Sequence, residues 1–300
     1  MKQPGEFVDG RYLLEREIGR GSHGQVFAAI DSASGRRVAI KVLNPSLEGD
    51  DQFVQRLWRE ARSLAALWGT SVVEVYAFGQ DQEDGAVYMA MELLQGETLS
   101  ERLEELELFD SRMSAYDILV ATQPIVIALN TAHKLGIIHR DLKPSNIFLV
   151  SPEFGGGSRL MDFGLAKVDD QLALTRAGVV AGSPNYMAPE MLRSEPFDHR
   201  IDVYSLGAVI YRALAGQPLF PGENPTQVLL RVLKDPRPRL TDLRPDLSPL
   251  VDDWVQEALA LDPSYRYLDT PSLWNGLLAA VQRGRNPSAY RARFLEPIEG

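Results

Sequence analysis

Apolar residues in the first ninety or so positions occur in short runs, many of them β-branched, which are typical of strands. Turn-forming clusters, such as Asp-Ser-Ala-Ser-Gly at 31–35, separate these runs at hairpin-like intervals. Residues 51–68 differ, because their apolar positions follow a helical period that ends at Leu67 and Trp68. The pattern predicts a small, mostly antiparallel sheet interrupted by one helix. The predicted strands are residues 12–14, 26–30, 38–43, 72–75 and 87–91.

The pattern becomes helical from residue 114 onward. Residues 202–215 are apolar almost all round, which predicts a helix enclosed by protein. Pro124 lies inside the first helical run and removes a backbone donor, so we expect either a kink there or a late helix start. The predicted helices are 114–135, 202–215, 226–233, 250–261 and 272–281, with β-like stretches at 147–150 and 160–161.

These elements predict an α+β fold made of two lobes. A small antiparallel β lobe with one helix, about residues 11–93, precedes a large, mainly α lobe, about residues 97–283. Residues 1–283 are therefore predicted to form one functional domain, with the lobes joined near residues 92–96. Residues 284–300 lack any period and are predicted to be a linker or tail.

Charge and cysteine content exclude several classes of function. Acidic residues outnumber basic ones by 41 to 31, and a net charge of −10 has the wrong sign for binding nucleic acid or anionic lipid. The absence of cysteine excludes disulfides, thiolate zinc sites, iron–sulfur clusters and a cysteine nucleophile, and it fits a cytoplasmic location. The most apolar stretch, 117–132, is interrupted by Gln123, Pro124 and Asn130, so we expect a membrane tether only from sequence beyond Gly300.

The six residues Gly-Arg-Gly-Ser-His-Gly at 19–24 match the pattern G-x-G-x-x-G. Dinucleotide-binding folds use the same pattern, but there a helix begins inside it, whereas here Gly24 leads into the strand-like residues 25–30. A glycine turn between two strands can cover phosphates with its backbone N–H groups. An ordinary glycine-rich hairpin remains the alternative for this motif alone.

Strand alternation places Ala39 and Lys41 on one face of the predicted strand 38–43 and the β-branched residues on the other. On the following predicted helix, Glu60 falls in the middle of the apolar stripe. A carboxylate at such a position is costly to bury unless a cation meets it, and Lys41 is the obvious candidate. The alternative is a pair of unrelated surface charges.

Residues 139–146, His-Arg-Asp-Leu-Lys-Pro-Ser-Asn, follow a predicted helix and precede a predicted strand. Within this loop Asp141 can accept a proton, Lys143 can contact a phosphate, and Asn146 offers an oxygen to a hard cation. A hairpin through the glycines at 155–157 would bring Asp162 alongside Asn146, and two such oxygens suit Mg²⁺. Taken singly, these motifs are also compatible with a surface ion pair and a plain turn.

In combination and in this order, the motifs are far more specific, and from about residue 12 to 281 the chain resembles a eukaryotic-like, bacterial Ser/Thr protein kinase catalytic domain. The resemblance implies a bilobal protein-kinase-like fold, ATP as phosphoryl donor with Mg²⁺ or Mn²⁺, and Ser or Thr hydroxyls of proteins as acceptors. It rests on the glycine loop 19–24, Lys41, Glu60, the Asp141 loop, Asn146, Asp162-Phe163-Gly164 and Ala188-Pro189-Glu190.

The resemblance also implies a role for each site residue. Asp141 would orient the acceptor hydroxyl, Lys143 would steady the transferring phosphoryl group, and Ser183 would bond both side chains. Lys41, held by Glu60, would contact ATP, while Asn146 and Asp162 would hold metal.

The resemblance also implies which residues contact adenine. Met91 would be the gatekeeper. Val26 and Ala39 would enclose adenine, and Glu92 and Leu94 would offer it backbone hydrogen bonds. The implied ATP-binding residues are Gly19, Arg20, Gly21, Ser22, His23, Gly24, Val26, Ala39, Lys41, Met91, Glu92, Leu94 and Phe148.

Further residues have structural or substrate-related roles by the same resemblance. Glu190 would pair with Arg266, and Asp202 would brace the catalytic loop. Lys143 and the sequence Gly-Ser-Pro-Asn-Tyr-Met-Ala-Pro-Glu at 182–190 resemble Ser/Thr rather than Tyr kinases. Ser145 stands where kinases that prefer basic substrates often carry Glu, which argues against a strong basic preference.

Thr175 is the candidate regulatory phosphosite, because it is the only threonine between Asp162 and Glu190. Arg140 precedes Asp141 and needs an anion beside it, and a phosphate on this long segment would provide one. We therefore expect autophosphorylation there, carried out on a second copy of the chain. A solvated loop hydroxyl is the alternative.

Three other functions each share part of this sequence pattern. A small-molecule phosphotransferase would lack the long segment that ends in Ala-Pro-Glu at 188–190. A nucleotide-binding scaffold without turnover would have lost Lys41, Asp141 or Asp162, and all three are present. A dinucleotide-dependent dehydrogenase would need a helix where the strand after Gly24 is predicted.

Overall fold

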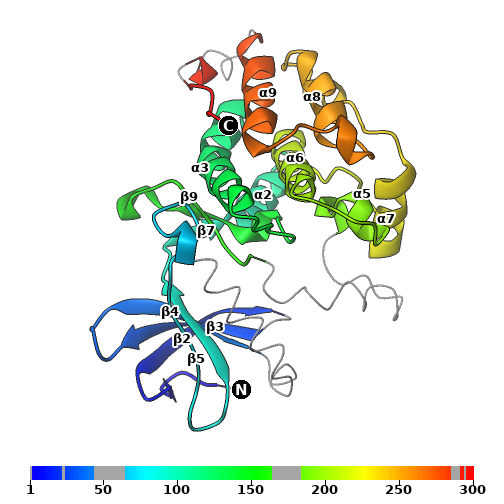
Figure 1. Ribbon diagram of the computed structural model, residues 1–300. Helices are drawn as coiled ribbons and strands as arrows, with labels where there is room; N and C mark the ends of the chain where they lie inside the picture. Colours follow the sequence, from blue (N-terminus) through cyan, green and yellow to red (C-terminus); the bar gives the residue numbers. More distant parts are fainter. Residues whose placement is uncertain (1, 22–23, 44–64, 164–183, 285–290, 294) are drawn as a thin grey trace. The chain divides into compact units, whose positions relative to one another are not determined.

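The computed structural model describes residues 2–21, 24–43, 65–163, 184–284, 291–293 and 295–300. The chain divides into two compact units, Met1–Gln95 and Gly96–Gly300. The first unit is built on a sheet and the second is mainly helical (Figure 1). These two compositions confirm the predicted α+β fold class.

The first unit contains a six-stranded antiparallel sheet with the strand order β1-β2-β3-β4-β6-β5. A predicted strand at 72–75 is wrong in position, because the strand runs over Val75–Gln80 instead. Gly79 interrupts the strand-like sequence pattern, and for this reason the strand was not predicted there. A Cβ on residue 79 would lie 2.7 Å from the Tyr88 hydroxyl, so glycine allows the Tyr88 side chain to pack against the backbone. The elements are β1 Phe7–Val8, β2 Tyr12–Gly21, β3 Gly24–Asp31, β4 Arg37–Leu43, the short 3₁₀ helix η2 Ala65–Leu67, β5 Val75–Gln80 and β6 Val87–Glu92.

The predicted helix 51–68 lies largely outside the described residues. At its described end, Leu67 is buried, but Trp68 is 76% exposed, so its predicted place on the apolar stripe is wrong. The 3₁₀ helix η2 ends at Leu67, and the chain turns through Gly69, which has a φ of +81°. This turn directs Trp68 away from the core.

One face of the first unit's sheet forms a hydrophobic core. On β4, the core residues are Val38, Ile40 and Val42, as the alternation predicted. Residues 2–8 also belong to this unit, because β1 pairs with β2 and the buried Lys2 ammonium lies 2.7 Å from Asp81.

The second unit contains a three-stranded antiparallel sheet and the long helices. Sequence reasoning missed the acidic helix α2, although Leu99, Leu103 and Leu106 follow a helical spacing and Thr98 and Glu101 form a capping box at its start. The strands are β7 Gly96–Thr98, β8 Ile147–Val150 and β9 Ser158–Leu160. The helices are α2 Leu99–Leu108, α3 Ala115–Lys134, α5 Pro189–Leu192, α6 Arg200–Ala215, α7 Pro225–Lys234, α8 Leu250–Ala258 and α9 Thr270–Gln282, with 3₁₀ turns η3 Pro144–Asn146, η4 Pro152–Phe154, η5 Pro184–Tyr186, η6 Leu240–Asp242 and η7 Pro263–Tyr265.

Helices α3, α6 and α9 form the centre of the second unit (Figure 1). Helix α6 is buried along nearly its whole length, as predicted. Helix α3 begins at Ala115, so a late start caused by Pro124 is wrong. Among the described helices, α3 alone is long and apolar enough to cross a membrane, with a mean hydropathy of 1.2. Half of that stretch is buried inside the protein, however. In addition, Trp274 and Thr270 of α9 donate hydrogen bonds to backbone carbonyls of α3. It therefore packs as a core helix of this unit.

The C-terminal segment, predicted as a linker or tail, packs on α9 in its described part. The Asn275 side chain donates to the Ile298 carbonyl and accepts from the Ile298 N–H, both at 2.8 Å. One end of the segment is held by Gln282, whose amide donates to the carbonyl of the buried Ala292. Residues 275 and 282 are seven apart and share one face of the helix, so this face holds the segment through its backbone.

Candidate functional site

The glycine-rich motif lies in a hairpin between β2 and β3, whose pairing extends to Gly21 opposite Gly24. Gly24 has a φ of +144°, and a Cβ there would lie 2.0 Å from the Val42 carbonyl oxygen, so only glycine fits. Arg20 forms a two-fold ion pair with Glu17 at 2.7 Å. Ser22 and His23 lie outside the described residues. A strand follows the glycine turn, which removes the dinucleotide-binding alternative.

Lys41 lies on the face of the first unit's sheet opposite the core cluster. Its neighbours across the sheet are Val26 on β3 and Met89 on β6. On the same face, Ala39 lies between Ala28 and Met91. Small and apolar side chains thus surround a lysine, which suits a flat apolar ring with an attached anion. Glu60, its predicted partner, lies outside the described residues.

The remaining predicted nucleotide contacts lie on strands or just after them. Glu92 ends β6, and its backbone N–H donates to the Glu74 carbonyl at 2.9 Å. Leu94 lies two residues after the end of β6 and is half-buried. In the second unit, Phe148 on β8 pairs with Thr98 and Arg159 and is half-buried.

The loop 139–146 is held in place by Asp202 near the start of α6. Asp202 is completely buried and accepts hydrogen bonds from the backbone N–H groups of His139 (2.8 Å) and Arg140 (3.0 Å). The His133 Nε2 lies 2.8 Å from the same carboxylate. Burial alone would raise the pKa of Asp202, but the hydrogen bonds and nearby imidazoles outweigh it and lower that pKa. The carboxylate therefore stays ionised and fixes the loop, as the resemblance implied.

His139 is buried and orders the chain on both sides of it. Its Nδ1 accepts from the Asp141 N–H at 3.3 Å, and its Nε2 lies 3.0 Å from the Met161 carbonyl. Burial lowers the pKa of His139 despite the opposing field of Asp202, so the imidazole is neutral with its proton on Nε2. The Phe163 ring packs on it with centroids 4.6 Å apart.

Asp141, Lys143 and Asn146 converge on this loop. Lys143 Nζ lies 2.9 Å from the Asp141 carboxylate, whose side chain is 13% exposed. The Asn146 amide donates to the Asp141 carbonyl at 2.8 Å and approaches its carboxylate at 3.4 Å. A carboxylate and a cation are thereby held together, accessible to a substrate. This arrangement can accept a proton and stabilise an anion at one place.

Asn146 and Asp162 lie side by side, as the hairpin prediction required. Strands β8 and β9 pair, and the backbone N–H of Met161 donates to the backbone carbonyl of Asn146 at 2.9 Å. Asp162 directly follows Met161, so it lies next to Asn146. Asp162 is exposed and has a φ of +50°, which directs the chain out of the hairpin. The Asn146 amide nitrogen is bonded to Asp141, which leaves its oxygen as the group that a cation would bind. Two such oxygens suit Mg²⁺, because that ion takes water and phosphate oxygens as its other ligands.

The segment 184–190 is anchored to the helices beneath it. The Ser205 hydroxyl donates to the Tyr186 carbonyl at 2.6 Å, and the Asn185 side chain accepts from the Phe220 N–H. Arg212 on α6 donates to the Tyr186 hydroxyl. The same guanidinium pairs with Glu107 on α2, a contact across 105 residues that sequence reasoning missed because no motif marks it.

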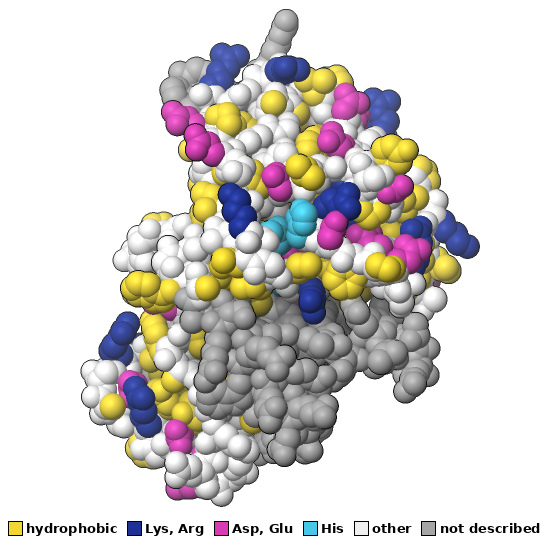
Figure 2. Space-filling view, viewed as in Figure 1, with side chains coloured by type: hydrophobic (Ala, Val, Ile, Leu, Met, Phe, Trp, Pro, Cys, Tyr) yellow, Lys and Arg dark blue, Asp and Glu magenta, His cyan; other side chains and the backbone are white. Residues whose placement is uncertain are grey.

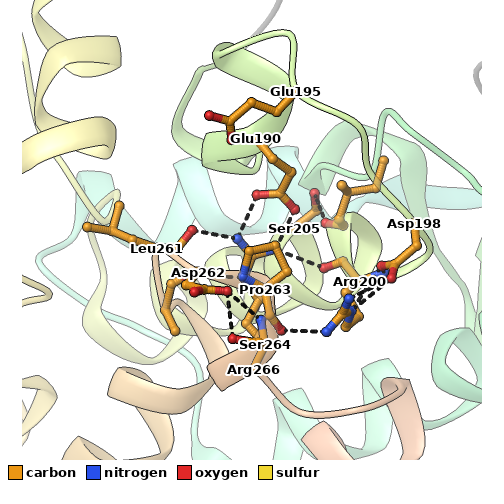
Figure 3. A network of polar contacts seen from close by, with 12 residues as sticks. Glu190, Glu195, Asp198, Arg200, Ser205, Leu261, Asp262, Pro263, Ser264 and Arg266 are labelled. Carbon is orange, nitrogen blue, oxygen red and sulfur yellow. Dashed lines mark hydrogen bonds and ion pairs between the residues drawn. The ribbon is translucent and has the colours of Figure 1, made fainter.

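Glu190 and Arg266 form the predicted ion pair beneath this segment (Figure 3). Arg266 also donates to the Ala260 carbonyl, and its guanidinium lies over the Tyr204 ring. Ser183 and Thr175 lie outside the described residues. The described part of the segment therefore has a rigid support built from α6 and the η7 region.

Comparison with known proteins gives a consistent set of relatives. The family model for the protein kinase domain matches residues 12–271. The chain is 37% identical over 286 residues to the serine/threonine-protein kinase PknA of Mycobacterium tuberculosis, covering 94% of this chain and 64% of that protein. It is 39% identical over 293 residues to a probable serine/threonine-protein kinase PknB of Corynebacterium glutamicum, covering 95% of this chain and 44% of that protein. The chain thus spans about half to two thirds of the length of these relatives.

Solved structures give the same result for the fold. A crystal structure of the PknI kinase domain of Mycobacterium tuberculosis matches with a TM-score of 0.72 and 25% identity. The match covers 93% of this chain and 100% of that one. Another structure of the PknI kinase domain matches with a TM-score of 0.73 and 26% identity.

Proposed function

The chain belongs to the protein kinase family, and from its site we propose that it is a Ser/Thr protein kinase that transfers the γ-phosphoryl group of ATP to protein hydroxyls. One observation carries this proposal. Asp141, Lys143 and Asn146 are bonded to one another on a loop that Asp202 fixes, and Asp162 lies beside Asn146. These side chains provide the proton acceptor, the cation and the metal ligands that phosphoryl transfer requires.

The first unit supplies the nucleotide contacts in this proposal. The glycine hairpin covers the phosphates with its N–H groups, and Lys41, held by Glu60, binds them by charge. Adenine lies against Val26 and Ala39, beside the gatekeeper Met91. Because the Glu92 N–H is already bonded to Glu74, its adenine contact is made by the carbonyl oxygen. Leu94 adds an apolar contact with the nucleoside.

The second unit performs the transfer. Asp141 orients the Ser or Thr hydroxyl and takes its proton as the oxygen bonds to the γ-phosphorus and the bond to the β-phosphate oxygen of ADP breaks. Lys143, 2.9 Å from Asp141, offsets the negative charge on the phosphoryl oxygens, and Ser183 holds both side chains. Asn146 and Asp162 hold Mg²⁺, or Mn²⁺ in its place, which neutralises phosphate charge when bound.

The acceptor is a protein rather than a small molecule in this proposal. The segment 184–190 is fixed to α6 by Ser205 and Arg212 and to the η7 region by the Glu190–Arg266 pair, and a segment held in this way can support an extended peptide. We further propose that Thr175 is phosphorylated by a second copy of the chain, and that the domain works in the cytoplasm, where ATP and Mg²⁺ are available. Its phosphate would pair with Arg140, which follows His139 with a φ of +67°.

Incubation with radiolabelled Mg²⁺-ATP and generic protein acceptors, followed by phosphoamino-acid analysis, tests the proposal. Label on phosphoserine and phosphothreonine is the expected result. Label that appears only on added small alcohols or sugars would instead indicate a small-molecule phosphotransferase. Nucleotide binding without any transfer would indicate a scaffold.

A further inference from the structure

Two histidine rings lie next to each other in the second unit. His133 lies in the last turn of α3, and His199 immediately precedes α6. Their ring centroids are 5.2 Å apart and their planes are tilted by 50°. Figure 2 shows histidine side chains reaching one face of the protein, bordered by charged side chains of both signs. Within the described residues, the structure shows one contact between these rings and the site above, the bond of His133 to the loop support Asp202.

Each of these histidines uses one ring nitrogen to donate to an oxygen. The His133 Nε2 lies 2.8 Å from the Asp202 carboxylate, and the His199 Nε2 lies 2.9 Å from the Leu268 carbonyl. Because an ionised carboxylate and a carbonyl have no proton to give, both Nε2 atoms must carry the hydrogen. In a neutral imidazole the Nδ1 lone pair is then available as a ligand.

The Nδ1 of His133 has an unusual environment. It is buried, and within the described residues it has no hydrogen-bond partner. A buried nitrogen without a partner is costly in a folded protein and calls for an explanation. A bound cation would satisfy it.

The hydrogen bonds and the ring spacing both match those of metal-bound histidines. Histidines that bind metal almost always donate their other N–H to a carboxylate or a backbone carbonyl, and these two show one case of each. With Zn–N bonds of about 2.0–2.1 Å, two imidazoles on a tetrahedral ion have ring centres roughly 5 Å apart. The observed separation of 5.2 Å is in this range.

We propose that His133 and His199 form a binding site for Zn²⁺ or a similar divalent transition-metal ion, ligated by their Nδ1 atoms and completed by water. Imidazole suits such ions, whereas Mg²⁺ prefers oxygen. The two imidazoles therefore set the ion's identity.

The remaining histidines give this proposal internal controls. The chain has four histidines and no cysteine, so few groups compete for such an ion. Both ring nitrogens of His139 are already engaged, and that side chain is fully buried. His23 lies outside the described residues and is far from His199 in sequence. It therefore serves as the matched control for histidine removal.

Occupation of this site would act on the support of the catalytic loop. A metal on the His133 Nδ1 fixes the hydrogen on Nε2, so the donor to Asp202 is always present. Asp202 in turn holds the N–H groups of His139 and Arg140. The ion would therefore stabilise the loop through one hydrogen bond.

Titration of the full chain with Zn²⁺ by calorimetry, in excess Mg²⁺ to occupy oxygen sites, tests the proposal. One Zn²⁺ per chain is expected, together with a melting temperature that rises with Zn²⁺ concentration. His199→Ala should weaken Zn²⁺ binding by at least about 10–100-fold, since even outer partners of a ligand have effects of that size. His23→Ala should bind as the parent does.

Three results would overturn the proposal. The parent could bind no Zn²⁺, His199→Ala could bind it as tightly as the parent, or His23→Ala could abolish binding. Circular dichroism of His199→Ala in the absence of zinc checks that the variant is folded. Should it be unfolded, His199→Gln, which keeps a polar side chain but offers no imidazole, takes its place with the same expected loss.

Discussion

Arg266 and Glu190 form a two-fold ion pair, with Nη1–Oε1 and Nη2–Oε2 distances of 2.6 and 2.7 Å, although they are 76 residues apart. The side chains are 0% and 3% exposed. The pair joins the end of the 184–190 segment to the loop before α9 (Figure 3). Because both charged groups are buried away from water, each is stabilised in its ionised form by the charge of the other.

Removal of one partner should therefore strongly destabilise the protein. Arg266→Ala is expected to lower the free energy of unfolding by about 3–5 kcal/mol, because Glu190 is left as an unpaired buried charge. Urea denaturation followed by circular dichroism measures this change. Arg102, whose side chain is 43% exposed in its ion pairs with Glu97 and Glu105, is the control, and Arg102→Ala should cost no more than about 1 kcal/mol. Equal effects of the two substitutions would contradict the account.

The buried neutral His139 should make stability depend on pH. Its pKa is lowered by burial, so at pH values between the folded and the ordinary pKa the unfolded chain binds a proton that the folded chain does not. The stability that the neutral His139 contributes is fully present above about pH 6.5 and is lost as the pH falls. The free energy of unfolding decreases by at most about 1.4 kcal/mol per pH unit. Asp202, whose pKa is lowered from an already acidic value, acts only at lower pH.

Urea denaturation at several pH values tests this dependence. The parent should lose stability between pH 6.5 and 5.5, and His139→Gln should show a smaller loss over that interval. Between pH 7.5 and 8.5 the two proteins should have the same slope, since the imidazole does not titrate there. The same loss below pH 6.5 in both proteins would contradict a neutral His139.

The C-terminal segment should contribute to the stability of α9. Asn275→Ala removes the two hydrogen bonds to Ile298 and should cost about 1–3 kcal/mol, at roughly 0.5–1.5 kcal/mol for each bond. Hydrogen exchange of the Ile298 amide should become faster in this variant. Glu299→Ala, at the exposed neighbouring position, should change neither quantity. Unchanged exchange at Ile298 in Asn275→Ala would show that the segment is not held there.

Thr175 should acquire phosphate when the protein is incubated with Mg²⁺-ATP, because a phosphate there can bind Arg140 bidentately and order the segment. Mass spectrometry locates the phosphate, and transfer rates compare Thr175→Ala with the parent. The alanine variant should be less active, while Thr226→Ala, at an exposed threonine on α7, should match the parent. Absence of phosphate at Thr175, or full activity of Thr175→Ala, would leave Ser183 or control without phosphate as the alternatives.

Local patterns predicted much of the fold and site. Alternation along β4 placed Lys41 opposite the core face, and the turn at 155–157 brought Asp162 next to Asn146, because both depend on neighbours close in sequence. Helix α2 was missed because its four glutamates make the segment read as polar, although Leu99, Leu103 and Leu106 follow a helical spacing. Trp68 was misplaced because a glycine turn ends the helical period.

Contacts between distant residues could not be predicted from spacing. The pairing of Arg212 with Glu107 and of His133 with Asp202 joins residues 105 and 69 positions apart, and charge alone does not select these partners. The Glu190–Arg266 and Asp202 contacts were expected only through the family resemblance. Glu60, Ser183 and Thr175 stay predictions, since they lie outside the described residues.

The most direct test of the kinase proposal compares Asp141→Asn with the parent in two measurements on the same preparations, Mg²⁺-ATP affinity by calorimetry and phosphoryl transfer to a protein acceptor. Asparagine keeps the shape of the side chain but cannot take the hydroxyl proton, so transfer should fall by about 10²–10⁴ while ATP affinity stays unchanged. Asp110→Asn, the same chemical change at an exposed position, should leave both unaffected. Transfer by Asp141→Asn at the parent's rate would contradict the assignment of Asp141, and with it the proposed function.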